Sequence, residues 1–462
     1  MWNNILLITP HFLTVLGFLL AILLLVHLLR SDQSPAATFA WLLAILLVPY
    51  VGVPLYILYG GRKMKKMASR KNRLTYTEAV AEKITEEDEV RFHYPSLFPV
   101  HKGNQLQFLE TGEEAYKEIV ELIKNSKNNI YITAYILGKD KTAKKILELL
   151  SQKAKDGVEV CLLLDALGCF YIKKGYLKHF TDAGGHVAYF MPMFPWPFWG
   201  RANLRNHRKM ILVDHKAAII GGMNIAKEYI GEVPDKARWV DLSFLARGPV
   251  VIDFYNVFQS DWNFAAEQPV LKEACLEEME KHSQDVLLQA IPSGPDVEGD
   301  ALLETILAAI FRAEKRIWIL TPYFIPNEIL LKALCIAAKN GIDVRIIVPN
   351  KSNHPVADLV RRGYLRTLQA SKAKILRYTK KMLHAKLILI DDDLAITGSA
   401  NMDIRSLSLN YEIALFIYAE KEIVEISDWV EELQKGCEEN LKPSTPVREV
   451  LEGVVRLFAP LL

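Results

Sequence analysis

The order of apolar and polar positions divides the chain into an apolar beginning and a longer body of alternating strands and helices. Two stretches without a full charge come first, Ile5–Leu29 and Ala36–Tyr59. Each is long enough for the roughly 20 residues that cross a bilayer core. We therefore expect two transmembrane helices within residues 1–61. The alternative is a signal peptide, but no positive segment precedes Ile5 and no small-residue cleavage site follows the first stretch.

From about residue 100, short apolar runs alternate with amphipathic helical stretches, which is typical of an α/β fold. A strand, a helix and a buried strand are predicted at 129–136, 142–155 and 158–165. The same three elements return in the same order at 316–324, 328–339 and 342–348. Units of this length are too large for a solenoid. We expect two halves related by a pseudo-twofold axis, each with a mixed sheet flanked by helices.

The expected organisation has four parts. A segment rich in Pro, Gly and Asp, Gln289–Asp300, marks the boundary between the two halves. The predicted parts are a transmembrane hairpin, a basic juxtamembrane linker, a first half, and a second half that ends in a C-terminal helix, at 1–61, 62–100, 101–292 and 293–462.

Charge is distributed unevenly, although the formal net charge is only +2. Arg62–Arg73 holds seven Lys and Arg residues and no acid, and Met1–Gly61 is neutral, which leaves −5 for Leu74–Leu462. A body of this charge is a poor surface for nucleic acid, so no nucleic-acid partner is expected. The basic segment directly follows the second apolar stretch and should face the cytoplasm. It either binds anionic headgroups as well or acts only as a topology signal.

One set of chemically active residues occurs once in each half with identical spacing. The first copy is His207, Lys209, Asp214, Gly221-Gly222 and Asn224, and the second is His384, Lys386, Asp391, Gly398-Ser399 and Asn401. Two such copies in one chain are not a chance event. The period of a strand puts each His and Lys on one face, where both can reach the same ligand. The small pair that follows lets the backbone approach that ligand, and the Asn projects from there.

These residue types suit the cleavage of a phosphodiester. Imidazole has a pKa of about 6.5 and serves as nucleophile or as acid near neutral pH. One histidine can attack phosphorus while the other protonates the departing alcohol. The lysines, with Asn224, Ser399 and Asn401, can donate to the phosphoryl oxygens, and each motif aspartate can hold a histidine in one tautomer.

The sequence predicts neither a metal nor another cofactor. Two lysines already neutralise a phosphate, and the spacing of His and Asp does not resemble a zinc site. The five cysteines (Cys161, Cys169, Cys275, Cys335 and Cys437) have no metal-like spacing and are expected to be reduced thiols in a cytosolic setting.

The doubled motif resembles the phospholipase D superfamily, in which two HxKxxxxD motifs from two halves meet across one cleft. The residues around the motifs are similar to those of bacterial cardiolipin synthases, namely Arg205–Lys209, Thr321–Pro326, Gly398–Ser406 and Asn410–Glu412. The two apolar segments and the ending Arg456–Leu462 are similar as well. The resemblance covers the whole chain, which favours this family over a secreted phospholipase D or a nuclease.

The resemblance implies a ping-pong transfer of a phosphatidyl group from one phosphatidylglycerol to another, with release of glycerol. It implies His207 as nucleophile, His384 as acid and then base, and motif aspartates that support the histidine of the other half. The expected location is the bacterial inner membrane, multi-pass, with a cytoplasmic catalytic body and membrane lipid as partner. A hydrolase and a phosphatidylserine synthase of the same superfamily remain open, and the oligomeric state is not indicated.

Two apolar segments each allow two interpretations. The aromatic run Met191–Trp199 either dips into the bilayer interface or packs between the halves. Val447–Leu462 has helical spacing and either packs on the body or lies in the interface.

Four further polar residues stand near the motifs. Asp241 and Glu412 follow their motifs and either orient side chains of the site or have a structural role. His215 and His354 have no counterpart in the other half and are expected to be non-catalytic, with His354 a candidate for lining the site.

Overall fold

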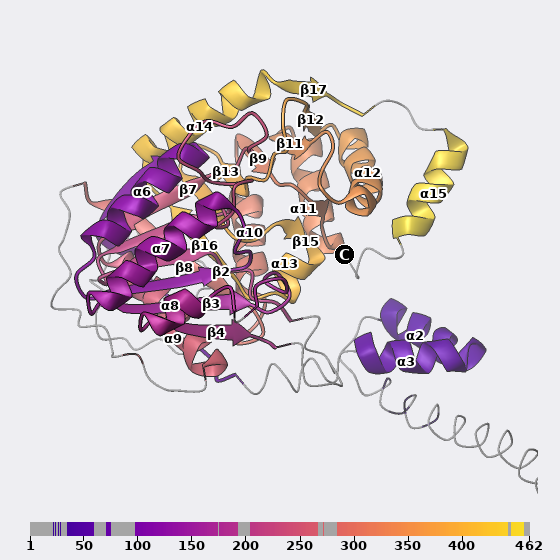
Figure 1. Cartoon of the computed structure of the whole chain (residues 1–462). Helices are drawn as coiled ribbons and strands as arrows, with labels where there is room; N and C mark the ends of the chain where they lie inside the picture. Colours follow the sequence, from indigo (N-terminus) through magenta and orange to yellow (C-terminus); the bar gives the residue numbers. More distant parts are fainter. Residues whose placement is uncertain are drawn as a thin grey trace, which may run out of the picture. The chain divides into compact units, whose positions relative to one another are not determined.

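The computed structural model describes residues 35–59, 71–74, 98–173, 175–192, 204–266, 271, 284–441 and 445–456, together with residues 22, 24, 26 and 28. The chain divides into two compact units (Figure 1). One comprises Met1–Lys71 with Met193–Leu204, and the other Asn72–Pro192 with Arg205–Leu462.

The first unit contains two short apolar helices, α2 (Pro35–Leu47) and α3 (Pro49–Tyr59). The ring of Trp41 meets that of Tyr56 edge to face at 5.4 Å. The second predicted span is therefore not one continuous helix, because Pro49 has no N–H to donate and its ring restricts the preceding residue. No helix among the described residues is both long and apolar enough to cross a membrane. Most of the first predicted span, and most of the basic linker, lie outside the described residues.

The second unit contains the predicted repeat. The elements of the first half are β1 (His101–Leu109), α6 (Gly112–Asn125), β2 (Asn129–Ala134), α7 (Lys141–Lys155), β3 (Glu159–Asp165), α8 (Lys178–Asp182), β4 (His186–Phe190), β5 (Met210–Val213), β6 (Ala217–Gly221), β7 (Ser243–Arg247) and α9 (Val250–Ala265). Those of the second half are β8 (Val286–Ser293), α10 (Ala301–Arg312), β9 (Arg316–Leu320), β10 (Phe324–Ile325), α11 (Glu328–Lys339), β11 (Asp343–Pro349), α12 (Pro355–Ala370), β12 (Lys374–Tyr378), β13 (Leu387–Ile390), β14 (Leu394–Gly398), β15 (Met402–Asp403), α13 (Ile404–Ser408), β16 (Glu412–Ile417), α14 (Glu420–Gln434), β17 (Cys437–Glu439) and α15 (Pro446–Arg456).

The strands of both halves form one mixed sheet, and their order repeats. The first half runs β1-β7-β6-β5-β2-β3-β4, and the second half runs β8-β16-β14-β13-β9-β11-β12-β17. The antiparallel pair β1 and β8 joins the two series. The second copy therefore begins with β8, and the boundary predicted from composition at Gln289–Asp300 falls partly inside this strand. The repeated order confirms two α/β halves with a mixed sheet.

Capping residues start and end the helices α7 and α11 at equivalent points in the two halves. Asp140 caps α7 by accepting from two backbone N–H groups, and Asn327 caps α11 by accepting from Leu330. After each helix a glycine adopts positive φ, +89° at Gly157 and +96° at Gly341. The predicted strand 316–324 is too long, because Pro322 cannot donate to a ladder; β9 ends at Leu320 and the next strand, β10, pairs with β15.

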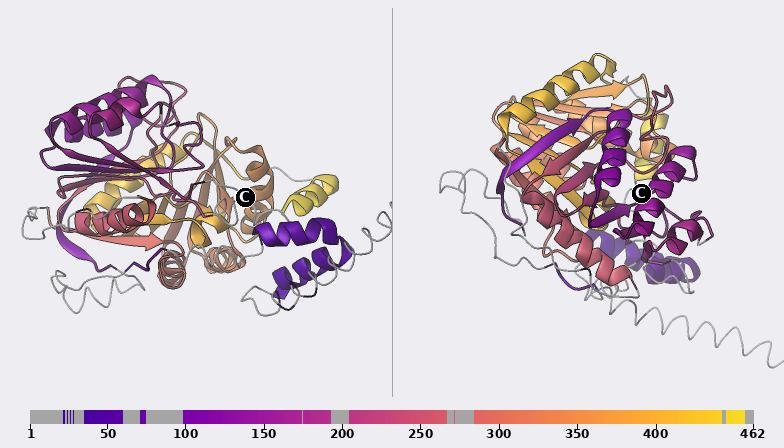
Figure 2. Two further views of the ribbon diagram at one scale, coloured as in Figure 1. Left: turned by 60° about the horizontal axis from the view of Figure 1, so that its bottom comes forward. Right: turned by 60° about the vertical axis from the view of Figure 1, so that its left-hand side comes forward.

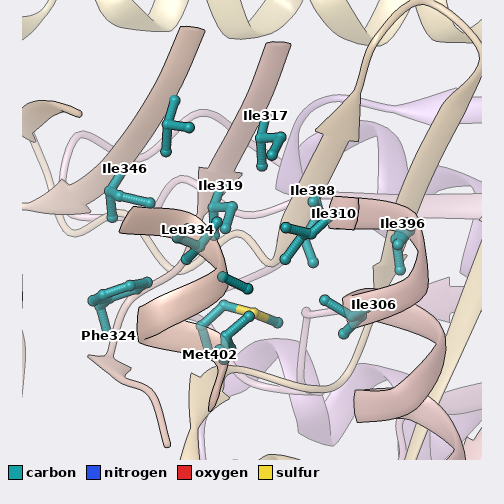
Figure 3. Close-up of a cluster of buried hydrophobic side chains, with 14 of the residues drawn as sticks. Ile306, Ile310, Ile317, Ile319, Phe324, Leu334, Ile346, Ile388, Ile396 and Met402 are labelled. Atoms are coloured by element: carbon teal, nitrogen blue, oxygen red, sulfur yellow. The ribbon is translucent and has the colours of Figure 1, made fainter. Parts of the chain in front are cut away.

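Each half has its own apolar core between the sheet and its helices. In the second half, Ile317, Ile319 and Ile346 from the sheet belong to one buried cluster with Ile306 of α10 and Leu334 of α11 (Figure 3). In the first half, α6 and α7 pack side by side on the strands (Figure 2). These cores hold the parallel strands in place, and the motif histidines and lysines lie beside the carboxyl ends of β2 and β9.

The predicted C-terminal helix packs on the body. Over its described residues, α15 contacts α12 through an ion pair of Glu452 with Arg366 at 3.1 Å and through Arg456 above the ring of Tyr364. This supports the first of its two interpretations. Of the aromatic run Met191–Trp199, only Met191 and Pro192 belong to the described residues.

Candidate active site

The backbone of each motif histidine is fixed by the other half. The amide of His207 donates to the carbonyl of Tyr411 at 2.9 Å, and the amide of His384 donates to that of Val240 at 2.7 Å. Both histidines lie in extended segments just before β5 and β13, not inside the strands as predicted. The predicted hairpins follow, since β5 pairs with β6 and β13 with β14. The two motifs are thus brought together by crossed backbone contacts.

The side chain of each histidine is held by a carboxylate that also comes from the other half. Nδ1 of His207 lies 2.9 Å from Oε1 of Glu412, and Nδ1 of His384 lies 2.6 Å from Oδ2 of Asp241. Both carboxylates are fully buried. A carboxylate on Nδ1 favours the tautomer with its proton there, which leaves the lone pair on Nε2. This supports the interpretation of Asp241 and Glu412 as orienting residues.

The two motif aspartates have a different role from the one predicted. The carboxylate of Asp214 accepts from three backbone amides, those of Lys127, Asn128 and Asn129. Asp391 accepts in the same way from Glu314, Lys315 and Arg316. Both have positive φ, 52° and 49°, at the turn after a strand. The expectation that they hold the histidines is therefore corrected: they fix the hairpin turns to the strands β2 and β9.

Two buried lysines bring positive charge to the histidines. Nζ of Lys209 donates to the carbonyl of His207 at 2.7 Å, and Nζ of Lys386 donates to that of His384 at 2.6 Å. Burial lowers the pKa of Lys209 to about 7, and Lys386 contributes to that shift. Burial likewise lowers the pKa of Lys386 to about 8. A bound anion would stabilise the charged form of each motif lysine and raise its pKa toward the ordinary value. Both lysines are therefore suited to bind an anion.

Burial disfavours the charged form of both motif histidines. Burial lowers the pKa of His207, against the effect of Glu412. Burial, assisted by Lys386, lowers the pKa of His384 to about 3. The lysine of each motif also lowers the pKa of the histidine of the other motif, so the two motifs share one electrostatic environment. Burial alone would raise the pKa of Asp241 and of Glu412. Lys386 and His384 outweigh burial at Asp241, and His207 and Lys209 outweigh it at Glu412, so the pKa of each carboxyl lies below its ordinary value.

The affinity for a phosphodiester anion is expected to fall as pH rises through 7 and 8, where Lys209 and Lys386 lose their protons. Above these values the anion can bind only after a lysine is reprotonated, which weakens binding up to about tenfold per pH unit and group. Calorimetric titration with a phosphonate analogue of phosphatidylglycerol at several pH values measures this. A dissociation constant that does not change between those pH values would contradict the prediction.

The residues after the second strand of each hairpin explain why one copy has Gly-Gly and the other Gly-Ser. A Cβ at Gly222 would lie 2.2 Å from Oδ1 of Asp241, so no side chain fits there. In the second copy, Ser399 donates through its hydroxyl to Glu412 and accepts from the amide of Ile413. Ser399 therefore binds the side chain of Glu412, whereas it was predicted to bind the substrate.

The two motif asparagines differ in whether their side-chain oxygen already has a hydrogen-bond partner. Oδ1 of Asn224 accepts from the amide of Ile136 at 3.1 Å. Oδ1 of Asn401 is buried and has no hydrogen-bond partner among the described residues. Leaving a buried acceptor unpaired is costly, so Asn401 is the better candidate for substrate binding, as an acceptor for a hydroxyl of the substrate.

Aromatic rings that the sequence pattern did not indicate lie next to the histidines. Tyr135 meets His207 edge to face with ring centres 4.8 Å apart. Tyr229 and Trp239, both from the first half, lie 5.1 and 5.4 Å from the ring of His384. Tyr135 lies in the predicted strand 129–136 and directly follows the observed strand β2.

His215 and His354, which were predicted to be non-catalytic, do not take part in these contacts. His215 packs against Tyr255 at 4.3 Å in the turn between β5 and β6. His354 is exposed at the start of α12 and contacts the ring of Tyr323. Among the described residues, no group of three or more His, Cys, Asp or Glu side chains is arranged to hold a metal ion.

Arg208, between the two motif residues, joins the halves under His207. Its side chain is fully buried and donates to the carbonyl of Glu412 at 3.0 Å, to Asp261 at 2.7 Å and to the carbonyl of Ser293 at 3.1 Å. It also pairs with Asp296 at 3.5 Å. The second copy has Ala385 at this position, and that difference was the signal for a special role. The guanidinium thus fixes the backbone of the residue that orients His207.

Arg208→Met is expected to destabilise the protein by about 3–5 kcal/mol, because Asp261 and Asp296 then remain buried without their cation. Arg377→Met is the control, since that arginine pairs with the exposed Glu438 and such a pair contributes about 0–1 kcal/mol. Thermal unfolding of the purified variants compares the two. Equal losses of stability in the two variants would show that the buried ion pairs of Arg208 contribute no more to stability than the pair of Arg377 with Glu438.

Comparisons with known proteins agree with this geometry. The model of the family described as cardiolipin synthase, PLD-like domain, matches residues 119–262 and 306–434, one segment in each half. A second model, phospholipase D-nuclease N-terminal, matches residues 19–61. The fold and site thus define a protein of the phospholipase D type with two related halves.

Curated relatives cover nearly the whole chain. A cardiolipin synthase of Halalkalibacterium halodurans is 32% identical over 94% of this chain and 90% of its own. The major cardiolipin synthase ClsA of Bacillus subtilis is 31% identical over 97% of this chain and 98% of its own. The crystal structure of a phosphatidylserine synthase of Haemophilus influenzae has the same fold, with a TM-score of 0.60 and 18% identity over 78% of this chain and 95% of its own. The chain belongs to the cardiolipin synthase family of the phospholipase D superfamily.

Proposed function

We propose that the protein is a phosphatidyltransferase that makes cardiolipin from two molecules of phosphatidylglycerol. The observation that carries the proposal is the pair of crossed contacts, His207 with Glu412 and His384 with Asp241, beside two buried lysines. Two oriented histidines and a cationic site provide a nucleophile, an acid and a place for the phosphoryl oxygens.

In the first step, Nε2 of His207 attacks the phosphorus of one phosphatidylglycerol. The bond from phosphorus to the glycerol oxygen breaks, and His384 gives that oxygen a proton, so that glycerol leaves and a phosphatidyl-histidine remains. The side chain of His207 is the more accessible of the two, 13% exposed against 6% for His384, which favours it as the nucleophile. The negative charge of the bound phosphodiester offsets the lysines and raises the pKa of His384, which allows it to carry the proton.

In the second step, the free glycerol hydroxyl of another phosphatidylglycerol attacks the phosphorus. His384 takes the hydroxyl proton, the N–P bond breaks, and His207 is restored together with the product. Lys209 and Lys386 bind the phosphoryl oxygens as negative charge develops on them. Oδ1 of Asn401 accepts from a glycerol hydroxyl of the substrate. The reaction consumes two phosphatidylglycerols and yields one cardiolipin and one glycerol.

We also propose that the amino-terminal part anchors the protein in the bacterial inner membrane with the catalytic body in the cytoplasm. The support is the pair of uncharged stretches, the basic segment Arg62–Arg73 and the family match at 19–61. Alkaline carbonate extraction of cell membranes tests this. The full chain should stay in the pellet, and release into the supernatant would contradict the proposal.

The activity is tested with the purified, detergent-solubilised protein and phosphatidylglycerol as sole lipid. Cardiolipin with an equimolar amount of glycerol is the expected result. Phosphatidic acid instead would mean that water resolves the intermediate and that the protein is a hydrolase. Turnover only after addition of a CDP-activated lipid and serine would favour a phosphatidylserine synthase.

A further inference from the structure

The segment that follows β3 presents aromatic side chains to solvent from a well-anchored loop. Phe170 and Tyr171 are 54% and 75% exposed, and their rings meet edge to face at 5.6 Å. Their neighbours Cys169 and Ile172 are buried and hold the loop on the core. Leu167, also exposed, donates its amide to the carboxylate of Asp165 at 2.9 Å. The exposed aromatic rings therefore stand on a fixed base.

This loop lies at the edge of the sheet that carries the site. The same carboxylate of Asp165 accepts from the amide of Asn206 and pairs with Arg205, the two residues before His207. In the second half, Ile329 and Val356 are 61% and 52% exposed where α11 and α12 begin. These helices follow β10 and β11, so both residues lie beyond the corresponding edge of the second half.

The charge of the loop also differs from that of the body. Between Ala166 and Lys174 the sequence contains Lys173 and Lys174 and no acidic residue, whereas Leu74–Leu462 as a whole is net −5. Lys178, further along, is paired with Asp182. Lys173 is exposed next to the aromatic pair. Aromatic rings beside lysines are suited to the interface of an anionic bilayer, where the rings enter the headgroup layer and the cations bind phosphate.

We propose that loop 166–173 docks the catalytic body on the surface of an anionic lipid bilayer, next to His207. The proposal rests on the proposed function, because a phosphatidyltransferase must bring its histidine to phosphodiesters at the level of the headgroups. Ile329 and Val356 extend the same surface in the second half. The loop shortens the path of a lipid from the bilayer into the site and leaves the chemistry itself unchanged.

The test uses the full chain with Phe170→Ser and Tyr171→Ser combined. Phe311→Ser is the matched control, since Phe311 is 66% exposed at the end of α10, just before β9 and thus at the opposite edge of the sheet. In proteoliposomes of phosphatidylglycerol, the loop variant should make cardiolipin about tenfold more slowly, the factor that corresponds to 1.4 kcal/mol of lost interface binding. On short-chain phosphatidylglycerol dissolved as monomers, the parent protein, the loop variant and the control variant should make cardiolipin at the same rate. Equal rates in vesicles, or an equal loss on monomers, would overturn the docking role.

A second measurement does not depend on turnover. In vesicles that contain brominated phosphatidylglycerol, the fluorescence added by Tyr171→Trp should be quenched and that added by Phe311→Trp should not. An added signal that neither brominated lipid nor acrylamide quenches would mean that another part of this chain covers the loop, and it would overturn the proposal. If the Tyr171→Trp signal is quenched but the parent protein makes no cardiolipin, the docking surface stands and the proposed function fails.

Discussion

His207→Asn is expected to abolish phosphatidyl transfer, with a loss on the order of 10⁶ in rate, because it removes the atom that bonds to phosphorus. His384→Asn should lose less, about 10²–10⁴, because it removes only general acid–base catalysis. The two variants should also differ in kind. His384→Asn should form the phosphatidyl-histidine slowly and then retain it, since no base activates the second alcohol.

The measurement is the retention of radioactive phosphorus on the protein after incubation with labelled phosphatidylglycerol. The protein is denatured in detergent at alkaline pH, because histidine N–P bonds break in acid. Label on His384→Asn and none on His207→Asn is the expected pattern. The opposite pattern would exchange the roles of the two histidines, and label on neither variant would argue against a covalent route.

The architecture could be predicted from the sequence because the signals for it are local. Helix spacing, the Asp-Gly and Asn-Gly helix ends and the buried strands recur in both halves, and the structure places α7 and α11 where the pattern does. The motif histidines and lysines were also accessible, because identical spacing in two copies marks them. The end of β9 at Leu320 was missed because the apolar run continues past Pro322, which the ladder does not tolerate.

The partners of the histidines could not be predicted in the same way, because they arise only from the docking of the two halves. His207 and Glu412 are 205 positions apart in the chain. The other pair uses an aspartate, Asp241, so the two copies do not even share a residue type. Equal spacing also marks residues that fix a turn, as Asp214 and Asp391 do. A repeated motif thus marks residues that have the same role in both halves, and that role is either catalytic or structural.

Glu412→Gln is expected to lower kcat by about 10⁴, the loss seen when a carboxylate that orients a catalytic histidine becomes an amide. The amide of the new side chain can donate to Nδ1 of His207, which moves the ring proton to Nε2 and removes the lone pair that attacks phosphorus. The affinity for the lipid phosphate should also fall, most clearly above pH 7, because the charge of Glu412 raises the pKa of Lys209 and of Lys386.

Asp214→Asn is the matched control, since it makes the same change in the motif itself. Asn tolerates the positive φ of this position. The new side chain keeps an acceptor for the amides of Asn128 and Asn129 but turns a second donor toward the amide of Lys127. The variant should therefore lose about 1–3 kcal/mol of stability while kcat stays the same. Steady-state kinetics and thermal unfolding of both variants separate the two roles. If Asp214→Asn lowered kcat as far as Glu412→Gln does, the motif aspartate would be part of the chemistry. The crossed carboxylates would then not be what orients the nucleophile.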